Sequence, residues 1–163
     1  VGELAALHRE GLRLLYVGFE TGNDEALAFM KKGNTAEEAI QQGRKLTEAN
    51  MIFNAIIMYG IAGKDKCVEN AKQTAKMLNQ LKPRKIITMN LTVFQGTELA
   101  SLVKEEKFAE AGVKEKMWEI KLLIENLDVE KRVEFDTTHA TNLVKLQGWL
   151  PEQREEFIEK LED

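Results

Sequence analysis

The stretch Leu14-Leu15-Tyr16-Val17-Gly18-Phe19-Glu20-Thr21-Gly22 decides the fold class of this chain. Its continuous apolar start is typical of a strand that is buried on both faces of a parallel sheet, and we expect that strand at residues 12–19. Two glycines then flank the Glu20 carboxylate, and a helical pattern follows directly. Ligand sites of parallel α/β folds lie at the carboxyl ends of the strands. Glu20 is therefore the first candidate for a functional side chain.

The same strand, glycine turn and helix occur twice more along the chain. Residues 52–59 form an apolar run that ends in Gly60-Ile61-Ala62-Gly63, and residues 85–93 form a third that ends in Phe94-Gln95-Gly96-Thr97. We expect helices at residues 24–30, 35–49 and 98–105, and an amphipathic helix through residues 71–81 that Pro83 ends. Three such units in succession predict an α/β fold with an open, right-handed parallel βα array.

The sequence changes character beyond residue 107. Apolar residues of 117–127 indicate a long helix, residues 132–135 a short edge strand, and residues 152–162 a final helix that starts with Pro151 in its first turn. Residues 136–148 lack a clear period and are expected to form a loop over the sheet. We therefore expect residues 1–107 to form the βα array. Residues 108–163 should form a C-terminal helical extension packed on the same domain, with no independent second domain.

Composition and charge exclude several classes of protein. The chain of 163 residues is 44% hydrophobic and 31% charged, which suits one packed globular domain. Its net charge of -4 argues against general affinity for nucleic acid or anionic membranes. No apolar run approaches the roughly 20 residues of a membrane span, and we expect a cytoplasmic protein. A single cysteine, Cys67, cannot form an internal disulfide, and neither His8 nor His139 has metal-ligand spacing.

The loops that begin at Gly18, Gly60 and Phe94 should share one rim, because the carboxyl ends of parallel strands point the same way. Glycines there allow a ligand to approach the backbone, and amide groups at helix starts favour anionic or polar groups. Glu20 suits a diol or a cation, and Lys32 suits a carboxylate or phosphate. The alternatives are a helix-dipole charge for Glu20 and a solvated surface residue for Lys32. No residue is predicted to be catalytic or to bind a metal.

Two further classes of function stay open from these residues. A βα-type enzyme would bind a phosphorylated metabolite at the strand-end loops, with the phosphate at residues 60–64. A non-catalytic module would instead bind a protein partner through an exposed apolar patch at residues 149–161.

Four segments resemble, in order, the later motifs of radical S-adenosylmethionine (SAM) iron–sulfur oxidoreductases, in the group of coproporphyrinogen-oxidase-type and Elp3-like members. Residues 18–27 with 30–35 resemble the family segment G-x-E-S-G-x-D-x-x-L followed by M-x-K-G-x-T. Residues 58–63 resemble its strand and G-L-P-G loop, and residues 93–99 its P-G-T-x-L turn. Thr141-Asn142 and residues 147–152 resemble the S-N and G-x-L-P-x-D ending.

The resemblance implies the later half of a partial (β/α)6 TIM-like barrel with SAM across the strand ends. It places Glu20 near the ribose hydroxyls and Lys32 near the methionine carboxylate. It also implies cofactor contacts from Thr21, from Gly60 and Gly63 beside the adenine, and from Gly96 and Thr97 on the substrate side. The intact enzyme would cleave SAM reductively with a [4Fe-4S] cluster and abstract hydrogen from an unknown substrate. Its electron donor would be a protein such as flavodoxin or ferredoxin.

The chain departs from the family pattern in ways that matter for activity. The family's C-x3-C-x2-C cluster motif is absent, Thr21 replaces a serine, and Ala62 and Gln95 replace prolines. The chain begins at Val1 rather than at a methionine. We therefore expect a fragment that supplies SAM-positioning loops and is inactive by itself. An uncovered edge on its first strand would favour self-association.

Overall fold

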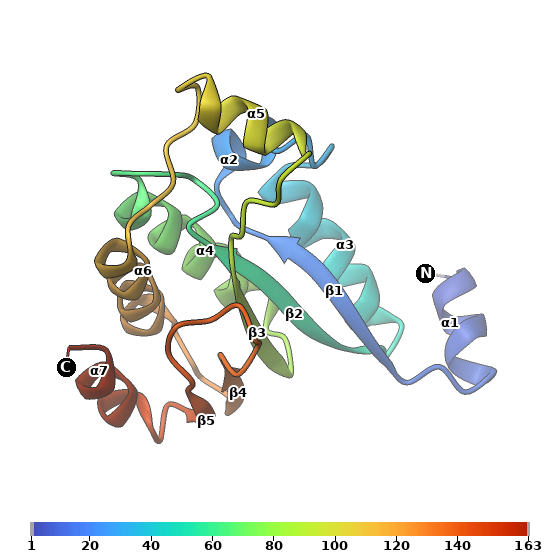
Figure 1. Cartoon of the computed structure of the whole chain (residues 1–163). Helices are drawn as coiled ribbons and strands as arrows, with labels where there is room; N and C mark the ends of the chain where they lie inside the picture. Colours follow the sequence, from blue (N-terminus) through green and yellow to red (C-terminus); the bar gives the residue numbers. More distant parts are fainter. Residues whose placement is uncertain (1, 163) are drawn as a thin grey trace.

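The chain folds into helices and one mostly parallel sheet, as the computed structural model of residues 2–162 shows (Figure 1). Five strands lie in the order of the sequence: β1 (Leu14–Glu20), β2 (Ile52–Tyr59), β3 (Lys85–Asn90), β4 (Val133–Asp136) and β5 (Gln147–Leu150). The first four run parallel to one another, and β5 runs antiparallel to β4. The predicted α/β fold with an open parallel βα array is confirmed.

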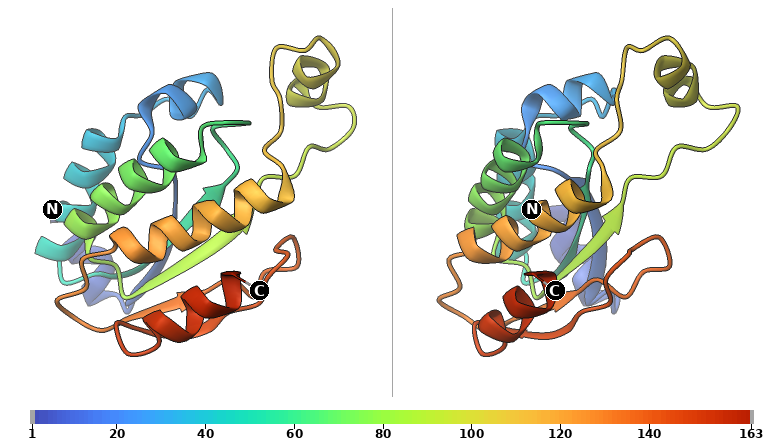
Figure 2. Two further views of the ribbon diagram at one scale, coloured as in Figure 1. Left: turned by 90° about the vertical axis from the view of Figure 1, so that its left-hand side faces the viewer. Right: turned by 60° about the vertical axis from the view of Figure 1, so that its left-hand side comes forward.

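Helices precede, connect and follow the strands, and some of them cover one face of the sheet. The helices are α1 (Gly2–Arg9), α2 (Asp24–Phe29), α3 (Ala36–Glu48), α4 (Cys67–Leu81), α5 (Glu98–Lys104), α6 (Val113–Asn126) and α7 (Arg154–Glu162). Figure 2 shows α3, α4 and α6 side by side on the same face, while α5 projects beyond the strand ends. None of the helices in residues 2–162 is both long enough and apolar enough to cross a bilayer.

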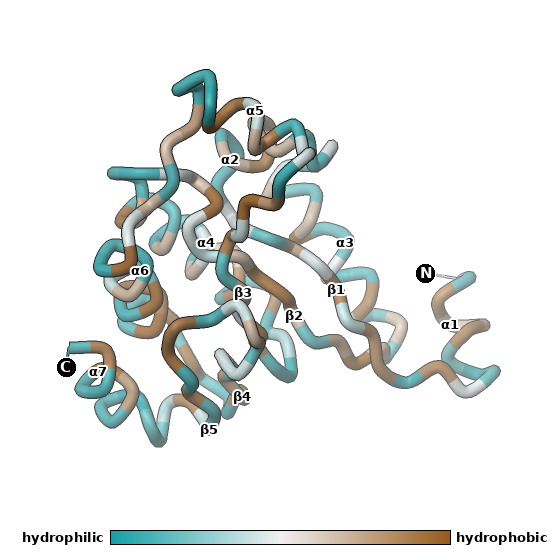
Figure 3. The backbone as a smooth tube through the Cα atoms, viewed as in Figure 1, coloured by the Kyte–Doolittle hydropathy of each residue, from teal (hydrophilic) through white to brown (hydrophobic). Residues whose placement is uncertain are grey.

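The core lies between this helical layer and the sheet. Along β2, Phe53, Ala55 and Ile57 are buried and belong to the same core cluster as Leu78 of α4 and Ile124 of α6. Successive side chains of a strand point to opposite faces, so these alternate positions meet the helices. Figure 3 shows a brown, hydrophobic stretch along β2. Burial of these apolar side chains is the main stabilising contribution to the fold.

Helix starts follow the predicted chemistry. Asn23 caps α2 by accepting a hydrogen bond from the Ala26 amide, at 3.0 Å. Thr35 and Glu38 form the reciprocal capping box at the start of α3. Each cap satisfies amide groups that the first turn of a helix leaves without a partner.

The fourth strand is internal, so the prediction of an edge strand at residues 132–135 was wrong. β4 pairs with β3 on one side and with β5 on the other. Lys85 fixes the first pairing, because its ammonium group lies 2.6 Å from Asp136 and 3.1 Å from Glu134. Burial alone would lower the pKa of Lys85, but the hydrogen bonds that its ammonium group donates to the two carboxylates raise it. The edge is β5, which the sequence pattern had assigned partly to a loop.

The C-terminal segment packs inward through its apolar residues. α7 lies against α6, and the rings of Phe157 and Phe135 are 6.3 Å apart. Phe157 and Leu161 are 1% and 7% exposed, and Leu150 is fully buried. The described residues 149–161 thus lack the exposed apolar patch expected of a partner-binding module, and that interpretation loses its basis.

The outer edge of β1 is unpaired among the described residues, because β1 stands at one end of the strand order. α1 precedes it and buries none of its residues, and Figure 1 shows this helix standing clear of the sheet. Tyr16 of β1 is 63% exposed and Ile52 at the start of β2 is 48% exposed. An edge of this kind offers free backbone groups to another strand.

The burial of Phe135 leads to a stability prediction. Phe135 is 0% exposed at the centre of β4, whereas Phe94 in a loop is 64% exposed. We expect Phe135→Ala to lower the free energy of unfolding by about 3–5 kcal/mol, because it leaves a cavity in the core. The matched Phe94→Ala change should cost less than about 1 kcal/mol. Urea unfolding followed by circular dichroism measures both, and similar losses for the two variants would contradict this packing.

Candidate functional site

The loops at the carboxyl ends of the parallel strands gather at one end of the sheet. They are residues 21–23 after β1, 60–66 after β2, 91–97 after β3 and 137–146 after β4. The third strand ends at Asn90, earlier than the predicted residue 93, so its loop is longer than expected. Figure 1 shows α2 and α5 above this end. Because the four strands are parallel, these loops form the rim that the sequence predicts.

Glu20 and Lys32 meet at this rim. The Glu20 Oε1 atom lies 3.2 Å from the Lys32 Nζ atom, and their side chains are 20% and 35% exposed. Glu20 has a φ of +67°, in the left-handed region that residues with a Cβ rarely adopt. The pairing of β1 with β2 also shifts register between Gly18 and Glu20. This backbone turn presents a partly exposed carboxylate and ammonium side by side at a strand end.

Thr21 points inward rather than toward the rim surface. Its hydroxyl is fully buried, donates to Asn70 Oδ1 at 2.6 Å and lies 3.0 Å from the Thr74 hydroxyl. It also accepts a hydrogen bond from the Asn23 amide, at 3.0 Å. Thr21 thus ties the β1 loop to α4. The Thr21 hydroxyl is already hydrogen-bonded within the protein. Its expected contact with a cofactor stays a prediction.

Gly22 continues this attachment for a steric reason. A Cβ atom at this position would overlap the carbonyl oxygen of Gln73 on α4. The Gly22 amide also donates to the Thr74 hydroxyl, at 3.1 Å. Glycine is needed here for the close approach of loop and helix.

The loop after β2 is held by two contacts from later parts of the chain. The Gly60 amide donates to Glu119 Oε2 of α6 at 3.0 Å, and the Lys64 amide donates to the Ala109 carbonyl at 2.8 Å. Gly63 has a φ of +86°, and a Cβ atom there would lie 2.9 Å from the Ala109 oxygen. Gly60 and Gly63 therefore fit the loop to its protein neighbours. Their expected contacts with adenine stay predictions.

The loop after β3 ends in a helix cap. The Thr97 hydroxyl accepts from the Ala100 amide at 3.2 Å and donates to the Phe94 carbonyl at 2.7 Å. Gly96 has a φ of +82°, with open space where a Cβ atom would lie. An ion pair of 2.5 Å between Lys31 and Glu98 joins α5 to the loop after α2. Gly96 and Thr97 thus shape a turn beside the rim, and their substrate-side role stays a prediction.

A cavity of about 290 Å³ lies at the outer side of this rim. Phe29 and Phe108 stack in its wall with ring centroids 5.5 Å apart. Three ammonium groups line it: Lys64, Lys66 and Lys107. Lys66 is 3.6 Å from Glu25, and Lys107 is 2.7 Å from Glu105.

The loop after β4 closes the last side of the rim through Asn142. Its amide donates to the carbonyls of Thr88 and Thr137, at 2.7 and 2.9 Å. Its Oδ1 atom accepts from the Tyr59 hydroxyl, at 2.9 Å. Burial raises the pKa of Tyr59 to about 12, so this hydroxyl stays protonated and donates. The predicted packing of this loop over the sheet is confirmed around Asn142.

Glu119 is the residue of this region that sequence reasoning missed. It is 4% exposed, and its other oxygen, Oε1, accepts from the Asn70 amide at 2.6 Å. Burial raises the pKa of Glu119 to about 7, although the bonds from Asn70 and Gly60 act in the opposite direction. Because Asn70 also binds Thr21, one carboxylate connects the loops after β1 and β2 to α6.

Metal-binding groups are scarce in the described part of the chain. Residues 2–162 contain no cluster of three or more histidine, cysteine, aspartate or glutamate side chains that could hold a metal ion. Cys67 is buried, and burial followed by the charges of Glu115 and Glu119 raises the pKa of its thiol to about 11. A neutral thiol is a poor metal ligand.

Comparisons with known proteins agree with this fold. Searches against protein-family models and against curated proteins found no match. Among solved structures, the chain is similar to the archaeal Elp3 of Methanocaldococcus infernus with an N-terminal deletion of residues 1–46. The TM-score is 0.68 at 19% sequence identity, and the match covers 99% of this chain and 38% of that structure. A likeness at this identity shows a shared fold, and this chain spans well under half of its neighbour.

The burial of Glu119 predicts a pH-dependent stability. Its pKa is about 7 in the folded chain against 4.5 as the ordinary value, so between these pH values the folded chain holds a proton that the unfolded chain has lost. Stability from this group is therefore greatest below about pH 4.5 and decreases as the pH rises toward 7. The total loss is about 3 kcal/mol.

Urea unfolding of the wild type, Glu119→Gln and the exposed control Glu125→Gln at pH 5 to 8 measures this effect. The difference in unfolding free energy between the wild type and Glu119→Gln should change with pH, while the control follows the wild type. A difference that stays constant from pH 5 to 8 would show that Glu119 titrates normally.

Proposed function

We propose that this chain provides the later βα units of a radical SAM domain and holds the cofactor at its strand-end rim. The observation that carries the proposal is the Glu20–Lys32 pair, 3.2 Å apart at the end of β1. The motif order in the sequence and the fold likeness to Elp3 both support it. The substrate, and an electron donor such as flavodoxin or ferredoxin, belong to the whole enzyme.

The rim residues suit the polar groups of SAM. Glu20 would accept hydrogen bonds from the two ribose hydroxyls, and Lys32 would bind the methionine carboxylate. Residues 60–63 would lie beside the adenine, and residues 96–97 would face the substrate. When bound in such a domain, SAM supplies the group that removes a hydrogen atom from the substrate.

A bound ligand would replace the contact between Glu20 and Lys32. A partly exposed ion pair contributes only about 0–1 kcal/mol, so separating it is cheap. A ligand that carries both hydroxyls and a carboxylate gives each residue a new partner. The pair is thus a preformed recognition unit for a molecule with those two groups.

An iron–sulfur cluster does not fit the residues described here. Such a cluster needs three or four thiolates, and the chain has one cysteine, which is buried with a raised pKa. The cluster ligands would therefore come from another part of the domain, and the proposed contribution of this chain is cofactor positioning. The unpaired edge of β1 is where a preceding strand, or a second copy, would pair.

The cavity of about 290 Å³ beside Lys64 favours a second candidate, a site for a phosphorylated metabolite. Phosphate binding there would use the Lys64 ammonium and the loop amides. Lys66 and Lys107 are already paired with carboxylates, which leaves less free positive charge than three lysines suggest. This candidate predicts tight binding of ribose 5-phosphate that Lys64→Gln weakens and Glu20→Gln does not affect.

The SAM proposal predicts binding that depends on both members of the pair. In a titration of the ¹⁵N-labelled chain with SAM, amide shifts should appear at residues 20–32, 60–63 and 94–97. Glu20→Gln and Lys32→Gln should each weaken this binding by about tenfold, because each removes a charged hydrogen-bond partner. The matched changes Glu48→Gln and Lys45→Gln, on α3 away from the rim, should have no effect. Shifts elsewhere, or variants that bind like the wild type, would contradict the proposal.

Cluster assembly gives an independent prediction. Anaerobic incubation of this chain with iron and sulfide should produce no visible iron–sulfur absorbance, because it lacks the thiolates. A chain extended upstream to include a three-cysteine motif should gain that absorbance. A stable four-iron cluster on the present chain alone would defeat the assignment.

A further inference from the structure

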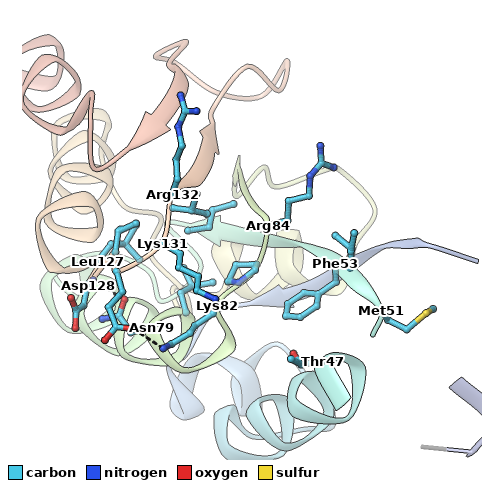
Figure 4. Close-up of a pocket in the computed structure, with 17 residues that line it drawn as sticks. Thr47, Met51, Phe53, Asn79, Lys82, Arg84, Leu127, Asp128, Lys131 and Arg132 are labelled. Carbon is cyan, nitrogen blue, oxygen red and sulfur yellow. Dashed lines mark hydrogen bonds and ion pairs between the residues drawn. The ribbon is translucent and has the colours of Figure 1, made fainter. Parts of the chain in front are cut away.

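A second cavity lies at the opposite end of the sheet from the rim. It has a volume of about 320 Å³, and Figure 4 shows the side chains around it. The starts of three parallel strands contribute to it, through Phe53 of β2, Ile86 of β3 and Val133 of β4. The segments that follow α4 and α6 complete its wall. Nothing in the proposed function uses this end of the molecule.

The floor of this cavity is apolar. Five side chains of the lining are less than 8% exposed and come from different elements: Met51, Phe53, Leu78, Leu127 and Val133. Binding pockets for small molecules are typically apolar hollows of about 300–1,000 Å³ with a few polar groups. The volume suits a ligand with one or two rings.

The mouth of the cavity is lined by more cations than anions. Lys82, Arg84, Lys131 and Arg132 line it together with two acids, Asp128 and Glu130. Lys82 pairs with Glu130 at 3.0 Å. Arg132 stacks on the Trp149 ring at 4.3 Å and pairs with Glu152 at 2.9 Å.

Of the four cations at the mouth, Arg84 and Lys131 are the two without an ion-pair partner among the described residues. Among residues 2–162, no carboxylate lies within 4.0 Å of either ammonium or guanidinium group. Figure 4 places Arg84 and Asp128 on opposite sides of the cavity in that view. The mouth therefore offers two cations without a protein partner beside an apolar floor.

The carbonyls at the end of α6 do not account for these cations. α4 and α6 end at this cavity, and the carboxyl ends of helices attract positive charge. The carbonyl of Asn126 already accepts from the Asn79 amide at 3.1 Å, and that of Leu127 accepts from Arg154 at 2.6 Å. The last carbonyls of α6 are thus satisfied by other side chains.

We propose that this cavity binds a small amphipathic carboxylate, an organic acid with one or two rings. Its apolar body fills the space over Phe53, Leu78 and Leu127, and its carboxylate meets Arg84 and Lys131. The planar guanidinium of Arg84 matches a carboxylate in two parallel hydrogen bonds. The site is separate from the rim and does not depend on SAM binding.

Three probes with the same naphthalene body and different charge test this assignment. The ¹⁵N-labelled chain is titrated with 1-naphthylacetate, with the neutral 1-naphthylacetamide and with the cationic 1-naphthylmethylamine. The acid should shift the amides of Leu78, Ile86, Leu127 and Val133 and should bind at least tenfold more tightly than either other probe. Equal affinity of all three probes, or shifts confined to the rim, would overturn the proposal.

Paired variants test the role of the two cations. The double change Arg84→Glu with Lys131→Glu should weaken binding of 1-naphthylacetate at least tenfold. The control Lys72→Glu with Lys114→Glu alters net charge equally at exposed positions outside the cavity. Both doubles replace exposed side chains, and their amide spectra report whether the fold is kept. Equal weakening by the two doubles would show general charge attraction and would overturn the assignment of the site.

Discussion

The buried carboxylate of Glu119 is the contact on which the rim depends. Its two oxygens accept hydrogen bonds from the Gly60 amide and from Asn70, and Asn70 in turn accepts from Thr21. A buried acid is costly unless such donors surround it, and a donor left without its acceptor would be costly too. The loops after β1 and β2 are therefore fixed to α6 and α4 as one unit. Burial of this unit away from water is the main reason why the pKa of Glu119 is raised to about 7.

The anchoring of Thr21 and Gly22 explains why Glu20 stands free beside them. Those two residues hold the chain against α4, one by hydrogen bonds and the other by the absence of a side chain. Glu20 turns into the left-handed region just before this attachment, and its carboxylate reaches Lys32. Unusual backbone angles persist only where the surroundings enforce them, and they are frequent at functional sites. Within this short segment, Thr21 and Gly22 are packed against α4, whereas the neighbouring Glu20 carboxylate is accessible.

Local sequence patterns predicted much of the fold because the central strands are continuous, mostly apolar runs that alternate with helical patterns. The expected burial of the first strand on both faces was wrong, since Tyr16 of β1 is 63% exposed. The bounds of β2 match the expected residues 52–59, and Thr35 with Glu38 marks the start of α3. β4 and β5 were harder, since each has four residues and β4 carries Glu134 and Asp136 on one face. Only the distant Lys85 makes those acids compatible with an internal strand.

For the site, Glu20 and Lys32 were predicted from the sequence, and the structure places them side by side. Glu119 was missed because a charged residue on a helix is normally solvated, although its spacing from Leu123 places it on the buried face.

The charge balance around the rim favours a ligand with mixed polar groups over a plain phosphate. Lys66 and Lys107 have carboxylate partners, so an incoming phosphate would compete with Glu25 and Glu105 for them. The Glu20–Lys32 pair is neutral as a whole. In the proposed complex it would exchange its internal contact for two external ones without leaving either charge alone. That exchange is favourable only for a molecule that brings a hydrogen-bond donor to the carboxylate and an anionic group to the ammonium. The methionine carboxylate and ribose hydroxyls of SAM meet both conditions at once, whereas a phosphate by itself meets only the second.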